Sequence, residues 1–348
     1  MIPVKVGISE RRTIAQQFVQ GKTRKLKVGH LQKLPSYARD VFYLLGDYAF
    51  KNSTDLGKAI DYYAMDLTFN PKRYDTWAAL ALSQASKMDK RLNSCLKFNP
   101  IKMLSYIGAV ETCFKRCLDM NDGNSNLWIE FGNFSYNMHS YVSRTLKNNS
   151  EDINIELFEK LEQKKEELMT SALRNYEKTL SIFEKDGISD DDIDERWLIH
   201  YMIGKIKEKT SGSLVTSLQS YVTSTQCLQN IGAVLPKKVN YNSPQPLSLE
   251  TLEIYYRIHA SVLKYLARYE TNEAGVDAAT RRGLYDVMRT VQLSKVYNTN
   301  AQENKSSRFT NKRKRNVSGN NILGNTNFLS SLSRAFPTAY RQDKFQVA

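Results

Sequence analysis

Glycine and proline are scarce in this chain, with 16 and 8 of 348 residues. β-Sandwiches and β-barrels need many tight turns, which these two residues usually supply, so their scarcity counts against both architectures. Tyrosine and phenylalanine are plentiful, with 20 and 14 residues. This balance favours an all-α protein with an aromatic core.

Cysteines and long apolar runs are also in short supply. The four cysteines, Cys95, Cys113, Cys117 and Cys227, form no dense disulfide framework. Cys113 and Cys117 would share one helix face, but no second pair or histidine lies nearby in sequence to complete a metal site, so we expect core packing. No run approaches the roughly 18 apolar residues of a membrane span, and the first residues lack the apolar core of a signal peptide. An intracellular protein without membrane contact is the expectation.

The net charge of +14 is concentrated at the two ends of the chain. Residues 1–33 and residues 301–348 each carry a net charge of +7, whereas residues 34–300 carry equal numbers of basic and acidic groups. A nucleic-acid-binding domain usually concentrates basic residues on its folded body. The distribution therefore predicts basic arms or targeting signals, and no direct specific DNA binding.

Apolar residues recur at i, i+3, i+4 and i+7 between residues 37 and 296, without a convincing strand pattern. The pattern predicts helices at Tyr37–Lys51, Leu56–Phe69, Tyr74–Lys87, Met103–Met120, Ser125–Leu146, Ile155–Glu184, Glu195–Lys209, Leu214–Ile231, Leu247–Tyr269 and Ala274–Val296. After about residue 300 the composition turns to Asn, Ser, Lys and Arg, which bury too little apolar surface to order a segment.

The helices follow the tetratricopeptide pattern, W-x2-L-G-x2-Y, then A-x3-F, then P, over about 34 residues. Its phase carries across two junctions, since Trp77 follows Pro71 by six residues and Trp128 follows Asp122 by six. The period is irregular, which implies insertions in helices or loops. The residues expected to pack the repeats are Phe42, Leu45, Gly46, Ala59, Tyr63, Pro71, Trp77, Leu80, Phe114, Trp128, Phe131, Gly132, Ala172, Tyr176 and Gly204.

Three glycines of this set follow a large apolar residue inside a helix, at Gly46, Gly132 and Gly204, and Ala81 takes the place in the second unit. A mid-helix glycine costs about 1 kcal/mol against alanine, so a common reason is needed. We interpret the small residue as the point where the paired helix approaches closely. The sequence predicts a tetratricopeptide-like α-solenoid of antiparallel helix pairs over residues 37–300, preceded by a basic arm (1–36) and followed by a disordered basic tail (301–348).

No catalytic, cofactor-binding or metal-ligating residues are predicted. The four histidines, His30, His139, His200 and His259, lack a partner at metal-ligand spacing, and no phosphate-binding loop or nucleophile motif occurs. The acidic run at 190–195 lacks the alternation and glycine of a calcium loop. It is interpreted as a solvated loop, or as a contact for a basic partner such as a histone tail.

One short motif concerns the localisation of the chain in the cell. Four consecutive cations, Lys312, Arg313, Lys314 and Arg315, lie in the polar tail. An import receptor needs an extended and accessible basic segment, so this motif predicts nuclear localisation.

Five segments of the helical region carry a family resemblance, at residues 37–52, 71–94, 127–144, 195–209 and 252–269. Together they resemble the amino-terminal repeat region of the calcineurin-binding protein cabin family. The resemblance implies a non-enzymatic scaffold subunit of the HIRA histone chaperone complex, which acts in replication-independent nucleosome assembly and transcriptional regulation. It implies HIRA, ubinuclein and the anti-silencing family of histone chaperones as partners, and indirect contact with histones. The segment for which the family is named has no counterpart here, so calcineurin is not an expected partner.

Two other functions compete with this one. Trp128, Glu130 and Phe131 are a weak cue for half-a-tetratricopeptide repeats, which would make the chain a nuclear RNA-processing scaffold. Pro71 and the A-x3-F pairs favour the histone chaperone scaffold over the RNA-processing scaffold. An enzyme with an attached repeat domain needs a catalytic domain, for which the helical region leaves no room. A scaffold would bind through exposed tyrosines, including some of Tyr136, Tyr141, Tyr255 and Tyr256, and would need no small-molecule substrate.

Overall fold

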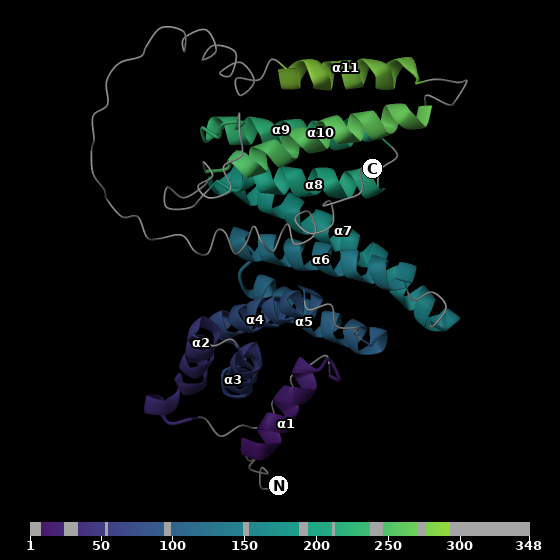
Figure 1. Cartoon of the computed structure of the whole chain (residues 1–348). Coiled ribbons are helices and arrows are strands. Elements are labelled where there is room, and N and C mark those ends of the chain that lie inside the picture. The colour runs from purple at the N-terminus through teal and green to yellow at the C-terminus, as the bar shows by residue number, and fades with distance from the viewer. Residues whose placement is uncertain are drawn as a thin grey trace, which may run out of the picture. The chain divides into compact units, whose positions relative to one another are not determined.

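The computed structural model describes residues 8–23, 34–52, 55–93, 99–148, 153–187, 194–210, 213–236, 246–269 and 276–292. These residues form α-helices and one 3-10 turn at Ser36–Ala38, with no strand among them (Figure 1). The α-helices are α1 (Ile8–Val19), α2 (Val41–Asn52), α3 (Leu56–Phe69), α4 (Tyr74–Asn93), α5 (Pro100–Met120), α6 (Ser125–Asn148), α7 (Ile155–Asp186), α8 (Arg196–Thr210), α9 (Leu214–Asn230), α10 (Ser248–Tyr269) and α11 (Ala278–Gln292).

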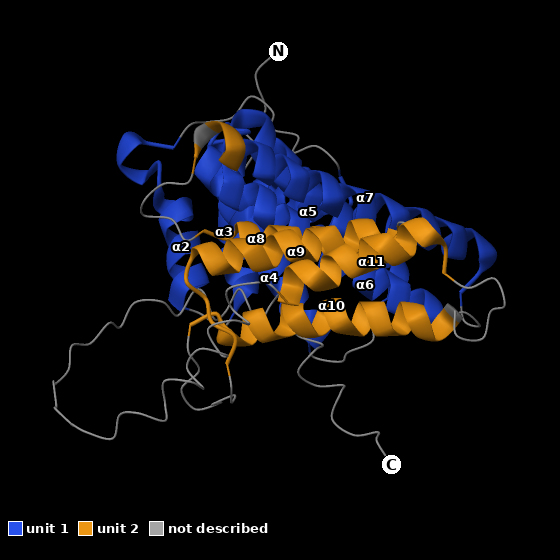
Figure 2. Cartoon of the chain, turned by 90° about the horizontal axis from the view of Figure 1, so that it is seen from above, with its two compact units in different colours: residues 1–182, 323–348 blue, residues 183–322 orange. Residues whose placement is uncertain are grey.

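The chain divides into two compact units, and the division falls inside α7 after Ile182 (Figure 2). Among the described residues, unit 1 holds α1 to α6 and most of α7, and unit 2 holds the last residues of α7 and α8 to α11. Each unit has its own set of buried residues.

In unit 1 each helix packs against the next one along the chain, from α2 to α6. In addition, α4 contacts both α2 and α6, the alternate helices on either side of it. Helices that follow one another through short connections form antiparallel neighbours, so α2 with α3 and α4 with α5 are helix pairs. The all-helical architecture of adjacent pairs agrees with the expectation from the sequence.

Local signals explain why these helices begin and end where they do. The side chain of Asp55 accepts a hydrogen bond from the backbone nitrogen of Gly57, which caps α3. The Asn99 side chain likewise caps α5, where Pro100 takes the first helical position. Asp66 near the end of α3 is buried and accepts a hydrogen bond from Thr76 at 2.6 Å, which fixes the start of α4 against α3.

The three mid-helix glycines lie where a partner helix comes closest. A Cβ atom added to Gly46 would lie 2.6 Å from the ring of Tyr63, and one added to Gly132 would lie 2.8 Å from the ring of Tyr176. In unit 2 the same contact recurs, with 2.5 Å from Gly204 to the ring of Tyr221. Real Cβ atoms do not approach so closely, so each tyrosine fills the space that the missing side chain leaves.

The two tryptophans of unit 1 make the same hydrogen bond. The indole nitrogen of Trp77 donates to the carbonyl oxygen of Pro71 at 2.9 Å, and that of Trp128 donates to the carbonyl oxygen of Asp122 at 2.8 Å. The six-residue spacing in the sequence therefore corresponds to one repeated turn. Trp77 is buried and meets Phe18 edge-on, whereas Trp128 is partly exposed.

The basic arm expected over residues 1–36 contains a helix, α1, that packs in the core of unit 1. This helix packs against α3 and α5 and buries Arg11, Ala15 and Phe18, which recur at i, i+4 and i+7. The Arg11 guanidinium donates to the carbonyl oxygen of Thr68 at 3.0 Å and lies over the ring of Phe69. A buried arginine with both partners is part of the fold, so a basic composition here does not indicate a free arm.

Leu45 is a second correction, because the structure leaves it exposed instead of packed. Its neighbour Gly46 faces the paired helix α3, which turns Leu45 toward the outer side of α2. The tail from residue 301, together with Lys312, Arg313, Lys314 and Arg315, lies outside the described residues. The residues that were expected to pack the repeats all lie within the described residues.

In unit 2, α8 and α9 form the closest helix pair, and α10 and α11 both pack against α9. Trp197, Tyr201 and Tyr221 are fully buried between these helices. The Ser224 hydroxyl of α9 donates to the carbonyl oxygen of Trp197 in α8. Val215 of α9 lies against Gly283 of α11, where an added Cβ would be 2.9 Å away.

Candidate protein-binding surface

Helix α10 has more apolar surface than its neighbours cover. One face of the helix is buried against the rest of unit 2. A second apolar face is exposed, and Tyr256 and Leu263 leave 67% and 65% of their surface to solvent. The buried face consists of Thr251, Ile254, Tyr255, Ile258, Ser261 and Val262. The exposed face, which we call the α10 stripe, consists of Leu252, Tyr256, Leu263 and Leu266.

The α10 stripe follows helical spacing. Its members stand at i, i+4, i+11 and i+14, so they line up along one side of the helix. A helix on the surface of a globular protein normally has one apolar face and one polar face. Since α10 has apolar side chains on two faces and its neighbours cover one of them, the stripe is a candidate surface for another protein.

Polar contacts hold α10 in place beneath the stripe. The carboxylate of Glu208, in α8, accepts hydrogen bonds from the Tyr221 hydroxyl at 2.7 Å and from the Ser261 hydroxyl at 2.8 Å. These two partners belong to α9 and α10, so one carboxylate joins three helices. Burial raises the pKa of Tyr221 well above its ordinary value, and the phenol therefore stays protonated as a donor.

A second carboxylate repeats this arrangement. Glu253 of α10 accepts a hydrogen bond from the Tyr201 hydroxyl at 2.9 Å, and the Arg257 guanidinium lies 3.7 Å from both Glu253 and Glu208. Burial, together with the positive charge of Arg257, lowers the pKa of Lys205 to about 8. The network fixes the height and rotation of α10.

Basic residues lie on a further side of α10. Arg257, Lys264 and Arg268 stand at i, i+7 and i+11, about 135° around the helix from the centre of the stripe. Glu253 is the acidic residue on this side, and it already pairs with Tyr201 and Arg257. The basic residues do not border the stripe, so the stripe offers a mainly apolar contact.

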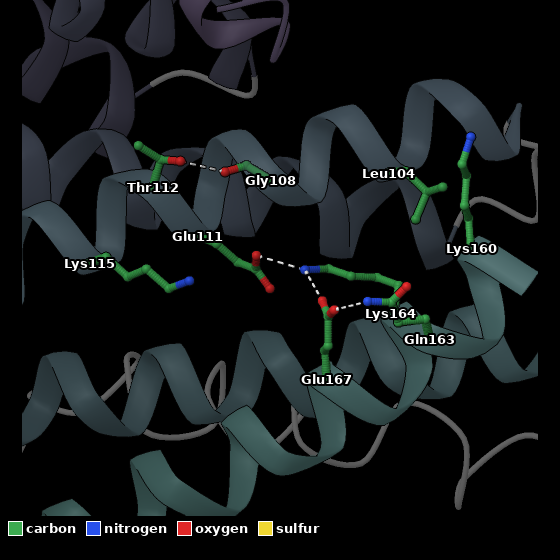
Figure 3. A pocket seen from close by; sticks show the side chains of 9 residues that line it. All are labelled: Leu104, Gly108, Glu111, Thr112, Lys115, Lys160, Gln163, Lys164 and Glu167. Carbon is green, nitrogen blue, oxygen red and sulfur yellow. Dashed lines mark hydrogen bonds and ion pairs between the residues drawn. The ribbon is translucent and has the colours of Figure 1, made fainter. Parts of the chain in front are cut away.

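Unit 1 contains a cleft between α5 and α7 with a volume of about 470 Å³ (Figure 3). Lys164 reaches across it from α7 and lies 2.8 Å from the Glu111 carboxylate of α5 and 3.3 Å from Glu167. Gln163 donates to the other oxygen of Glu167 at 2.9 Å. The Lys164–Glu111 ion pair therefore braces α7 against α5 across the cleft.

No group of three His, Cys, Asp or Glu residues that could hold a metal ion occurs among the described residues. His139 lies 3.0 Å from the carbonyl oxygen of Lys165. Burial raises the pKa of the Cys117 thiol to about 12 and that of the Cys113 thiol as well, so both are unreactive core residues.

The four tyrosines expected to form a binding surface divide into two groups. Tyr256 is exposed on the α10 stripe and Tyr141 is partly exposed in α6. Tyr136 and Tyr255 are buried, because both point toward neighbouring helices. The sequence does carry a signal for the leucines of the stripe, since apolar residues cover most of the circumference of α10.

No protein-family model matches the chain. Within the described residues, no helix is both long enough and apolar enough to cross a membrane.

Proposed function

We propose that the chain is a non-enzymatic scaffold that binds other proteins through tetratricopeptide-like helix pairs. The observation that carries this proposal is the α10 stripe, an apolar face held rigidly by the Glu208 and Glu253 networks and exposed to solvent. Helical repeats offer extended surfaces of this kind to peptides and partner domains. The contacts of Gly46, Gly132 and Gly204 with tyrosines of the paired helices support the repeat assignment.

The partners we propose are HIRA, ubinuclein and the anti-silencing family of histone chaperones, in a nuclear complex for replication-independent nucleosome assembly. The support is the resemblance to the cabin family, and its five segments fall on α2, α4, α6, α8 and α10. These are alternate helices along the chain. The resemblance therefore follows the architecture of the chain and is not confined to one region.

The α10 stripe can be tested with a pair of charge substitutions. The full chain and its Tyr256→Asp, Leu263→Asp double variant are each offered to purified HIRA and ubinuclein. We expect the wild-type chain to retain at least one partner and the double variant to lose it, because aspartates at two exposed positions disrupt the apolar contact without touching the core. Ile155→Asp is the matched control, since Ile155 is exposed at the start of α7.

Equal binding by the double variant and the wild-type chain would remove the α10 stripe from the proposal. Loss of binding in the Ile155→Asp control as well would indicate a general effect of added charge. Recovery of RNA-processing factors in place of histone chaperones would favour the competing scaffold function.

A further inference from the structure

The first helices of the successive pairs can be aligned on their small residue, which is Gly46 in α2, Ala81 in α4, Gly132 in α6 and Gly204 in α8. Three positions on each helix, five and one residues before the small residue and two after it, lie on one face. We call this face the docking face. In α2 it consists of Val41, Leu45 and Tyr48.

The docking face is buried in every helix except α2. In α4, α6 and α8 none of its nine members exposes more than 4% of its surface. In α2 the exposed fractions are 43% for Val41, 40% for Leu45 and 68% for Tyr48. The nine buried members are Thr76, Leu80, Ser83, Leu127, Phe131, Phe134, Ile199, Ile203 and Ile206.

The contact between α5 and α6 shows what covers this face. Phe114 of α5 stacks on Phe131, with ring centroids 4.9 Å apart, and meets Phe134 at 6.0 Å. In this part of unit 1 the second helix of one pair therefore covers the docking face of the next pair. Among the described residues no helix takes this place on α2, because α1 packs against α3 and α5. Terminal units of repeat proteins usually have a polar outer face, and α2 has an apolar one.

The charges beside this face are already neutralised. Asp47 pairs with Lys51 at 2.9 Å, and Asp40 pairs with Arg73, which also reaches Asp66. Leu44 extends the apolar surface and is 60% exposed. Recognition here therefore depends on apolar shape more than on charge.

We infer that the docking face of α2 binds an amphipathic α-helix of a partner protein in the way that α6 receives α5. The partner helix carries apolar side chains at i, i+4 and i+7 with an aromatic residue in the middle, as Val110, Phe114 and Cys117 do in α5. This site is distinct from the α10 stripe and does not depend on which complex the chain joins.

A peptide with the sequence of α5 tests the inference. The probe is residues 100–120 with a fluorescent label and the changes Cys113→Ala and Cys117→Ala, titrated with the full chain and followed by fluorescence anisotropy. We expect saturable binding that a Leu45→Asp, Tyr48→Asp double variant weakens by about tenfold or more. A peptide that also carries Phe114→Asp is expected not to bind.

Ile155→Asp at the start of α7 is the matched control, because Ile155 is an exposed aliphatic residue outside both the docking face and the α10 stripe. Its affinity for the peptide should equal that of the wild-type chain. Circular dichroism of the double variant should show unchanged helix content, since its substitutions lie on the surface.

Three results would overturn the inference. The first is absence of saturable binding by the wild-type chain. The second is an equal loss of binding in Ile155→Asp, which would indicate unspecific apolar contact. The third is a dimer in light scattering that Leu45→Asp dissociates, because a second copy of the chain would then be the occupant.

Discussion

Replacing Gly132 with alanine should destabilise unit 1, although the same change inside most helices stabilises. The added Cβ would lie 2.8 Å from Cε1 and 3.0 Å from Cζ of Tyr176. This ring cannot move aside easily, because Tyr176 is buried and its hydroxyl donates to the Asn133 side chain at 2.8 Å. The two helices must therefore separate or the ring must leave its rotamer.

The magnitude follows from two opposing effects. Alanine gains about 1 kcal/mol over glycine inside a helix, whereas overpacking of a tight core costs about 1–3 kcal/mol. Gly132→Ala should therefore lower the free energy of unfolding by up to about 2 kcal/mol. Gly108→Ala is the matched control in the same unit, since an added Cβ there meets nothing within 4 Å and should stabilise by about 1 kcal/mol.

Urea denaturation followed by circular dichroism measures both variants. The helix-propensity contribution is the same in each, so the difference between them isolates the cost of the contact with Tyr176. A Gly132→Ala variant as stable as Gly108→Ala would refute the close approach of α6 and α7 on which the repeat packing rests.

Three further predictions concern single features of the chain. Ser83→Ala should raise the free energy of unfolding by about 1 kcal/mol, because the buried hydroxyl has no hydrogen-bond partner among the described residues; a less stable variant would contradict this. Glu208→Ala should destabilise unit 2 by about 2 kcal/mol or more, since it leaves the Tyr221 hydroxyl unpaired, and hydrogen exchange should quicken first in α10. Changing Lys312 through Arg315 to alanine should move a tagged chain out of the nucleus without altering its melting temperature, as microscopy and thermal denaturation would show.

Most helix boundaries could be predicted from local signals. The pattern predicts Leu56–Phe69, and α3 has these bounds because the Asp55 cap and the Asn70–Pro71 break are both local in sequence. It predicts an end at Lys87 for the next helix, and α4 continues to Asn93. Met88 is buried and Leu92 is partly buried in the added turns, so the apolar spacing continues past Lys87 and the predicted end is too early.

The packing of α1 could not be predicted in this way. Its sequence is basic and weakly periodic, and the partners that bury Arg11 are Thr68 and Phe69, far along the chain. Likewise, the apolar residues of α2 and α10 are visible in the sequence, but their exposure depends on which helices pack against them. Tertiary contacts decide both cases.

The glycine contacts could be predicted in part from the sequence. The spacing pointed to close approach at Gly46, Gly132 and Gly204 and identified Tyr63 and Tyr176 as members of the paired helices. It gave no partner for Gly204, because a serine precedes Tyr221 by four residues where the pattern expects alanine. The same ring occupies the same space without that signal.

The most direct test of the scaffold function is a binding assay with the full chain, because a fragment that begins at residue 34 would lose α1 with Phe18 and uncover Trp77. HIRA, ubinuclein and duplex DNA are offered separately at about 50 and 200 mM salt, a range over which phosphate contacts lose orders of magnitude in affinity. We predict that HIRA or ubinuclein binds at both salt concentrations and that DNA binds weakly or not at all. Tight, salt-sensitive binding of DNA with neither protein bound would contradict the account.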